Sequence, residues 1–239
     1  NCAREPHVVA VANFINACGG KVTGAGTDTI RVRGVDRLVG TTQTVIPDDI
    51  EAGTWMMAAA MTQGDVTLQN VIPTHLSPIM AKLREAGVEI HELTDAVRVI
   101  GRGRPKAINV KTLPYPGFPT DAQSQMTALL SLGDGTSYVT ETLYEDRFRF
   151  VPELVRMGAQ IRVEGRTAIV KGVERLYGAP VEATDIRAGA ALVIAGLAAE
   201  GETTIYGMEH VQRGYEKLEQ KLLGLGADVK MERQGAAVV

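Results

Sequence analysis

Asp121 is an acidic residue in a stretch of chain whose backbone has few conformational options. Three prolines and a glycine lie among the eight residues before it, and each proline fixes its own backbone φ angle. The carboxylate either caps the N-terminus of the helix that follows or acts as a general base next to a bound hydroxyl group. The sequence alone leaves both interpretations open.

Arg187 lies two residues after Asp185, at the start of one of the most apolar stretches of the chain. Asp185 is in a position where it can cap this predicted helix, in the same way as Asp121. An arginine in the first turn opposes the helix dipole and costs stability unless it finds an acidic partner or a bound anion. The placement of Arg187 therefore favours a functional role.

Arg147 and Arg213 both lie where a loop is predicted to enter an amphipathic helix, at matching places in a repeated pattern. The planar guanidinium group donates two parallel hydrogen bonds and suits phosphate and carboxylate groups. Either arginine alone reads equally well as a solvated surface residue. Because the positions match, we expect the two side chains to face the same end of the molecule.

Several classes of site find little support. The glycines of GAGTDT and GRGRP do not form a dinucleotide fingerprint or a phosphate-binding loop. The net charge of −3 argues against a nucleic-acid partner, and there is no apolar run long enough to span a membrane. The histidines are scattered without metal-ligand spacing, so we expect no metal site; they are His7, His75, His91 and His210.

Cys2 and Cys18 are too few to form a disulfide framework, so we expect reduced thiols and a cytoplasmic protein. The chain has 239 residues and opens without a methionine or a signal-like segment. We therefore expect it to be a piece of a longer protein.

The elements that must position these residues repeat along the chain. A helical pattern closing on Gly-x-x-hydrophobic recurs at Gly19, Gly87, Gly158 and Gly226, at steps of 68, 71 and 68 residues. Each unit reads as helix, strand, strand, helix, strand. Such self-similarity predicts units that bury their apolar faces against one another in a pseudo-symmetric α/β domain.

The two helices of each unit differ in kind. The pattern of residues 76–86 predicts an amphipathic surface helix with one apolar face. The stretches that begin at Asp49, Asp121 and Asp185 are apolar or small on every side, so we expect three buried helices with sheets packed outside them. If their N-termini meet on one side, the free N–H groups and dipoles create a site for a phosphorylated substrate.

Five segments together resemble the bacterial UDP-N-acetylglucosamine enolpyruvyl transferase family, across essentially the whole chain. In order, they are NCAREPHVV, FPTDAQSQ, TETLYEDRF, ATDIRAGAALVIAG and RGYEKLEQKL. The resemblance implies an inside-out α/β barrel in two pseudo-symmetric domains, in a protein about twice this size. Residues 1–45 would be the end of the second domain, and residues 46–239 would be most of the first.

The resemblance also implies a reaction, the first committed step of peptidoglycan precursor synthesis. The enolpyruvyl group of phosphoenolpyruvate moves to the 3-hydroxyl of UDP-N-acetylglucosamine, and phosphate leaves. No metal or other cofactor is expected. By motif, Asp121 contacts the sugar hydroxyl and is the candidate base, while the main chain of Leu143 binds the nucleotide sugar.

The remaining site residues follow from the same motifs. Those on the phosphoenolpyruvate side are Arg147, Asp185, Arg187 and Arg213. Two acidic residues lining the cleft match less closely, Glu5 of AREP and Asp48 of IPDD.

The family also uses a Lys-Asn pair and a mobile loop with a reactive cysteine, neither of which this sequence matches. Cys2 and Cys18 do not correspond to that cysteine, so we expect the 239-residue chain alone to be inactive. Two alternatives stay open: a related enzyme resembling enolpyruvylshikimate phosphate synthase, and a non-catalytic binding module of the same fold. The sequence does not indicate an oligomeric state.

Overall fold

The computed structural model describes residues 1–232, so the last seven residues of the predicted 46–239 domain lie outside it. The α-helices are α1 Pro6–Ala17, α2 Asp49–Met61, α3 Ser77–Glu85, α4 Gln123–Leu130, α5 Val151–Arg156, α6 Ile186–Ala198, α7 Glu209–Gln212 and α8 Leu218–Gly224. Two short 3-10 turns, η1 Pro73–Leu76 and η2 Thr120–Ala122, precede α3 and α4.

The strands form four small sheets. They are β1 Lys21–Thr23, β2 Arg31–Arg33, β3 Asp65–Gln69, β4 Glu89–Glu92, β5 Ala96–Ile100, β6 Val110–Lys111, β7 Thr136–Thr140, β8 Gln160–Glu164, β9 Thr167–Lys171, β10 Pro180–Glu182 and β11 Thr204–Tyr206. The strand orders are β1-β2, β3-β5-β4, β6-β7-β9-β8 and β10-β11. All pairings are antiparallel except β6 with β7 and β10 with β11. The predicted order of elements is confirmed, with β6, β10 and α7 as short additions.

The helix ends show why the glycine pattern repeats. Gly19, Gly87, Gly158 and Gly226 have φ angles of 91°, 89°, 94° and 87°, in the left-handed region that favours glycine. After each glycine, the next backbone N–H bonds to a carbonyl five residues before it, as Val88 N does to Leu83 O at 2.9 Å. This arrangement ends each helix and turns the chain toward the following strand or segment.

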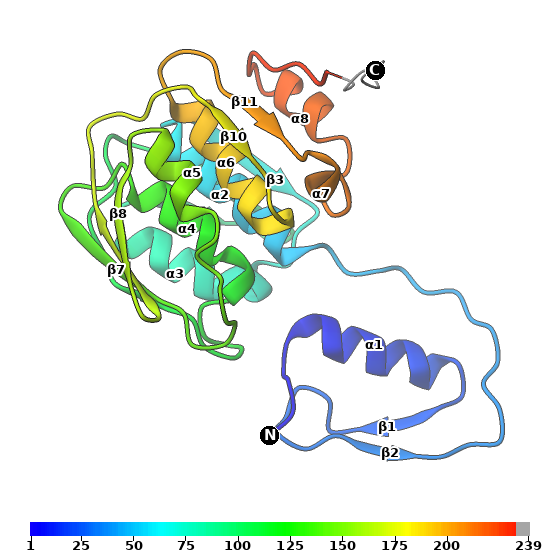
Figure 1. The fold of residues 1–239 in the computed structure, drawn as a ribbon. Coiled ribbons are helices and arrows are strands. Elements are labelled where there is room, and N and C mark those ends of the chain that lie inside the picture. The colour runs from blue at the N-terminus through cyan, green and yellow to red at the C-terminus, as the bar shows by residue number, and fades with distance from the viewer. Residues whose placement is uncertain (233–239) are drawn as a thin grey trace, which may run out of the picture.

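The core consists of helices, as the sequence predicts. α2, α4 and α6 contact one another, and every residue of α4 is buried. Figure 1 shows these three helices inside the larger part of the molecule, with strands around them. The amphipathic prediction for residues 76–86 is also confirmed, because its five apolar residues are buried; they are Leu76, Ile79, Met80, Leu83 and Ala86.

A polar network lies among the buried helices. The Tyr215 hydroxyl lies 2.9 Å from Thr54 Oγ1 of α2, which also accepts a hydrogen bond from Gln125 Nε2 of α4 at 3.0 Å. These contacts tie the segment after α7 to the centre of the core. They satisfy polar groups whose burial without partners would be costly.

The first helix and hairpin form a separate small unit. Among residues 1–232, the hydrogen bonds made by residues 1–33 stay within residues 1–39. Residues 31–45 are exposed throughout, and Figure 1 shows an extended linker without regular secondary structure between β2 and α2. The assignment of residues 1–45 to a second domain stays a prediction.

Candidate active site

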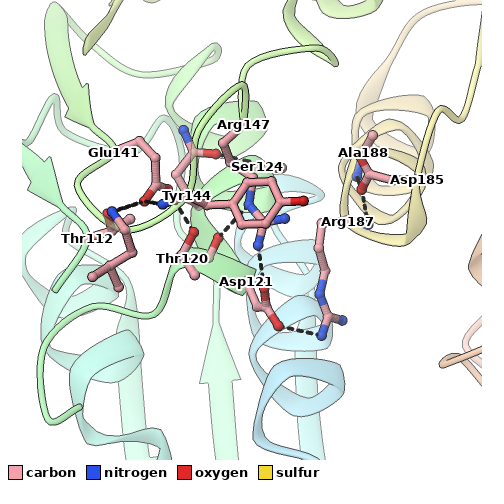
Figure 2. A network of polar contacts seen from close by, with 12 residues as sticks. Thr112, Thr120, Asp121, Ser124, Glu141, Tyr144, Arg147, Asp185, Arg187 and Ala188 are labelled. Carbon is pink, nitrogen blue, oxygen red and sulfur yellow. Dashed lines mark hydrogen bonds and ion pairs between the residues drawn. The ribbon is translucent and has the colours of Figure 1, made fainter. Parts of the chain in front are cut away.

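Asp121 lies between two arginines from distant parts of the sequence, as Figure 2 shows. Its Oδ2 accepts a hydrogen bond from Arg187 Nη2 at 2.8 Å, and its Oδ1 is paired with Arg147 Nη2. The side chain of Asp121 is 41% exposed, whereas those of Arg147 and Arg187 are 10% and 17% exposed. These three residues form the Asp121 cluster, in which a partly exposed carboxylate is paired with two largely buried guanidinium groups.

Three elements bring these residues together. Asp121 lies in η2, ahead of α4, and Arg187 lies in the first turn of α6. Arg147 comes from the segment between β7 and α5, and its Nε also donates to the Thr120 carbonyl at 3.3 Å. Because α4 and α6 pack against each other, their N-terminal ends place Asp121 and Arg187 side by side.

The two arginines set the charge state of Asp121. Burial alone would raise the pKa of this carboxyl group, but the charges and hydrogen bonds of Arg187 and Arg147 lower it below its ordinary value. Burial alone would lower the pKa of Arg187, and its pairing with Asp121 raises it instead. Asp121 is thus held as a carboxylate and Arg187 as a cation.

The acidic partner that an arginine in the first turn of a helix needs is supplied by Asp121. This ion pair explains how Arg187 is tolerated at the start of α6. The capping interpretation of Asp121 is wrong, because its carboxylate pairs with arginines and α4 has no side-chain cap. The 3-10 turn places Asp121 beside the helix end rather than at the capping position.

Two other predicted site residues are helix caps. Asp185 accepts hydrogen bonds from the backbone N–H groups of Arg187 and Ala188, at 2.7 and 2.9 Å. Asp48 caps α2 through the N–H groups of Ile50 and Glu51, at 2.8 and 3.0 Å. Each carboxylate satisfies donors that a helix N-terminus leaves free. A contact of either residue with substrate stays a prediction.

The structure does not join the remaining predicted residues to the Asp121 cluster. Leu143 is 44% exposed on the segment that follows β7. Arg213 is exposed at the end of α7, and within residues 1–232 its side chain makes no hydrogen bond or ion pair. Glu5 precedes α1 in the separate N-terminal unit. Their roles remain predictions.

Sequence reasoning missed two neighbours of the cluster. The Tyr144 ring lies under the Arg147 guanidinium, with its centroid 4.7 Å from Cζ, a cation–π contact. Glu141 is buried and bonds to Thr112 and Thr120, as Figure 2 shows. The only signal for Glu141 was an acidic residue between two threonines at the end of a predicted strand.

The described part of the chain contains no group of three or more acidic, histidine or cysteine residues placed to hold a metal ion. Within those residues there is also no helix long and apolar enough to cross a membrane. The Asp121 cluster itself offers an acid–base carboxylate and anion-binding guanidinium groups.

Comparison with known proteins identifies the family of the chain. The family model for EPSP synthase (3-phosphoshikimate 1-carboxyvinyltransferase) matches residues 1–222. A UDP-N-acetylglucosamine 1-carboxyvinyltransferase of Desulfofundulus thermocisternus is 61% identical over 220 residues, which cover 92% of this chain and 90% of that relative. The chain belongs to the UDP-N-acetylglucosamine 1-carboxyvinyltransferase family.

Other carboxyvinyltransferases are considerably longer. The UDP-N-acetylglucosamine 1-carboxyvinyltransferase 3 of Symbiobacterium thermophilum is 95% identical over all 239 residues, which make up 56% of its length. The chain thus spans about half the length of this relative and of a 59% identical relative from Caldanaerobacter subterraneus. Activity therefore has to be considered for a longer protein.

Solved structures show the carboxyvinyltransferase fold. The enolpyruvyl transferase NikO from Streptomyces tendae superposes with a TM-score of 0.84 at 29% identity, covering 94% of this chain and 54% of NikO. An EPSP synthase from Acinetobacter baumannii superposes with a TM-score of 0.73 at 21% identity, covering 92% of this chain and 54% of that enzyme. The chain has the enolpyruvyl transferase fold.

Proposed function

We propose that the full-length protein transfers the enolpyruvyl group of phosphoenolpyruvate to the 3-hydroxyl of UDP-N-acetylglucosamine and releases phosphate. Family membership supports the reaction, and the Asp121 carboxylate held between Arg147 and Arg187 carries the proposal. The 29% identical enolpyruvyl transferase NikO supports a shared type of chemistry. The complete fold is then an inside-out barrel of repeated units, in which residues 1–45 belong to a second domain.

The proposed reaction has two steps. Asp121 takes the proton of the sugar 3-hydroxyl as the sugar oxygen bonds to C2 of phosphoenolpyruvate. The C2–C3 double bond opens and C3 takes a proton from a general acid of the full-length protein, giving a tetrahedral intermediate. The bond between C2 and the phosphate oxygen then breaks, C3 returns its proton to that group, and the enolpyruvyl ether and phosphate leave. Positioned cations stabilise charge that develops on the phosphate and carboxylate, which is usually a large contribution to catalysis.

The chain supplies several of the groups proposed for this reaction. Arg147 and Arg187 are two cations next to the base, and Arg213 is a third arginine proposed for the same anion. The main chain at Leu143 is the proposed contact for the nucleotide sugar. Glu5 and Asp48 are acidic residues proposed to border the substrate cleft, and Asp185 is proposed to lie on the phosphoenolpyruvate side. A cytoplasmic location, expected from the reduced cysteines, stays a prediction.

The test replaces Asp121 by asparagine in the full-length enzyme. Loss of a well-placed general base costs about 10²–10⁴-fold in rate, so we expect kcat to fall by that factor in phosphate-release assays with both substrates. Asparagine is nearly the same size, so folding should be retained. Asp134→Asn is the matched control, because Asp134 is exposed and its side chain is outside the cluster. Wild-type turnover by Asp121→Asn would refute the assignment.

A further inference from the structure

Glu141 is a buried acidic residue that no step of the proposed reaction uses. It follows β7 directly, and only 1% of its surface is exposed. Burial of a charged carboxylate is costly unless hydrogen bonds replace its water shell. The position therefore requires an explanation in terms of its partners.

Four donors surround the Glu141 carboxylate. Its Oε1 accepts from Thr112 Oγ1 at 2.7 Å and from the backbone N–H groups of Leu143 and Tyr144, at 2.8 and 3.0 Å. Its Oε2 accepts from Thr120 Oγ1 at 2.8 Å. Burial would raise the pKa of Glu141, but these hydrogen bonds lower it below its ordinary value.

The backbone of Glu141 is itself fixed. Its N–H donates to the Arg166 carbonyl at 2.8 Å, and its carbonyl accepts from Arg166 Nε at 2.9 Å. Arg166 lies between β8 and β9, and β9 pairs with β7 in the same sheet. Glu141 therefore holds its partners against a rigid part of the fold.

The two carboxylate oxygens reach two different parts of the proposed site. Oε1 holds the turn at Leu143 and Tyr144, where the nucleotide sugar is proposed to contact the main chain. Oε2 accepts from Thr120, the residue before Asp121. The backbone carbonyl of Thr120 also accepts a hydrogen bond from Arg147 Nε. One side chain thus spans the sugar-binding turn and the turn that carries the base.

We propose that Glu141 is a positioning residue that fixes the Leu143 main chain relative to Asp121, so that a bound nucleotide sugar presents its hydroxyl to the base. This inference rests on the proposed function. Charge-assisted hydrogen bonds are roughly twice as strong as neutral ones, which makes a carboxylate better suited to this task than an amide. A merely structural Glu141 would affect stability but leave the kinetics of the folded enzyme unchanged.

The test measures kcat and both KM values for variants of the full-length enzyme. Glu141→Gln keeps the shape but removes the charge, so we expect the KM for UDP-N-acetylglucosamine to rise about tenfold or more. Thr120→Val removes only the bond between Glu141 and the Asp121 turn, so we expect kcat to fall about tenfold while that KM changes little. Thr120→Ser retains the hydroxyl and should restore kcat.

The control is Glu164→Gln, which makes the same chemical change at an exposed end of β8. Thermal unfolding verifies that each variant is folded, and if Glu141→Gln does not fold, the Thr120 pair carries the test. Folded variants with wild-type kcat and KM would overturn the positioning role while leaving the reaction intact. Failure of the wild-type enzyme to convert the two substrates would instead refute the proposed function.

Discussion

At the scale of single residues, Asp121 combines two demands that oppose each other. Arg187 and Arg147 lower its pKa, and a carboxylate stabilised by two cations is a weak base. Phosphoenolpyruvate carries a phosphate and a carboxylate, which compete for the same guanidinium groups. On the proposed function, binding of that anion draws the arginines away from Asp121 and raises its pKa when the sugar hydroxyl has to be deprotonated.

Replacement of Arg187 by methionine tests this double role in the full-length enzyme. Loss of a cation raises the pKa of Asp121, so more of it is protonated at any given acidic pH. We therefore expect the acid limb of the pH profile of kcat/KM to move to higher pH. We also expect the KM for phosphoenolpyruvate to rise about tenfold or more, because a charged hydrogen-bond donor is lost.

The control for that variant is Arg162→Met, which removes an exposed arginine paired with Glu164 at the far sheet edge. Its pH profile and KM values should match those of the wild-type enzyme. If the Arg187→Met profile also kept the wild-type acid limb, Arg187 would not control the protonation of Asp121.

At the scale of elements, the close packing of α6 depends on a glycine. A Cβ added at Gly189 would lie 2.2 Å from Val211 Cγ2 and 3.0 Å from Ala183 Cβ, and both neighbours are buried. Alanine gains about 1 kcal/mol over glycine in a helix interior, but overpacking of a core costs about 1–3 kcal/mol. The second effect dominates here because an approach of 2.2 Å to a fully buried side chain is far closer than van der Waals contact.

We expect Gly189→Ala to lower the free energy of unfolding of the chain by about 1 kcal/mol or more, measured by urea denaturation. Gly196→Ala is the control in the same helix, where the nearest heavy atom to an added Cβ is Thr203 Cβ at 3.3 Å. There the gain in helix propensity should offset the mild crowding. A Gly189→Ala chain as stable as the wild type would show that α6 and α7 can separate without cost.

The repeated elements were predictable because their signals are local. Each glycine at a helix end and each apolar face depends on residues within a few turns, and the structure confirms them. The pairing of Asp121 with Arg187 joins residues 66 positions apart, so it depends on how α4 packs against α6. The burial of Glu141 likewise arises from tertiary packing and has no periodic pattern in the sequence.

At the scale of the whole molecule, the described chain divides into two parts of very different size. Within residues 1–33, the buried apolar residues are Ala12, Cys18 and Val22. Val11, Phe14 and Val32 are 57%, 46% and 72% exposed in the same part. A unit below about 40 residues rarely has a core large enough to be stable alone. On the proposed domain division, residues of a longer chain cover these apolar side chains.

Hydrogen exchange tests how independent the small unit is. In the 239-residue chain, we expect the amides of α1 to exchange at least about 100-fold faster than those of α4, because α1 opens locally whereas α4 opens only with the core. In the 95% identical Symbiobacterium thermophilum relative, whose chain is longer, the α1 amides should gain protection. The α4 amides serve as the internal control, since they should change little. Equal protection of α1 and α4 in the short chain would contradict the division, because it would mean that residues 1–33 unfold only together with the helical core.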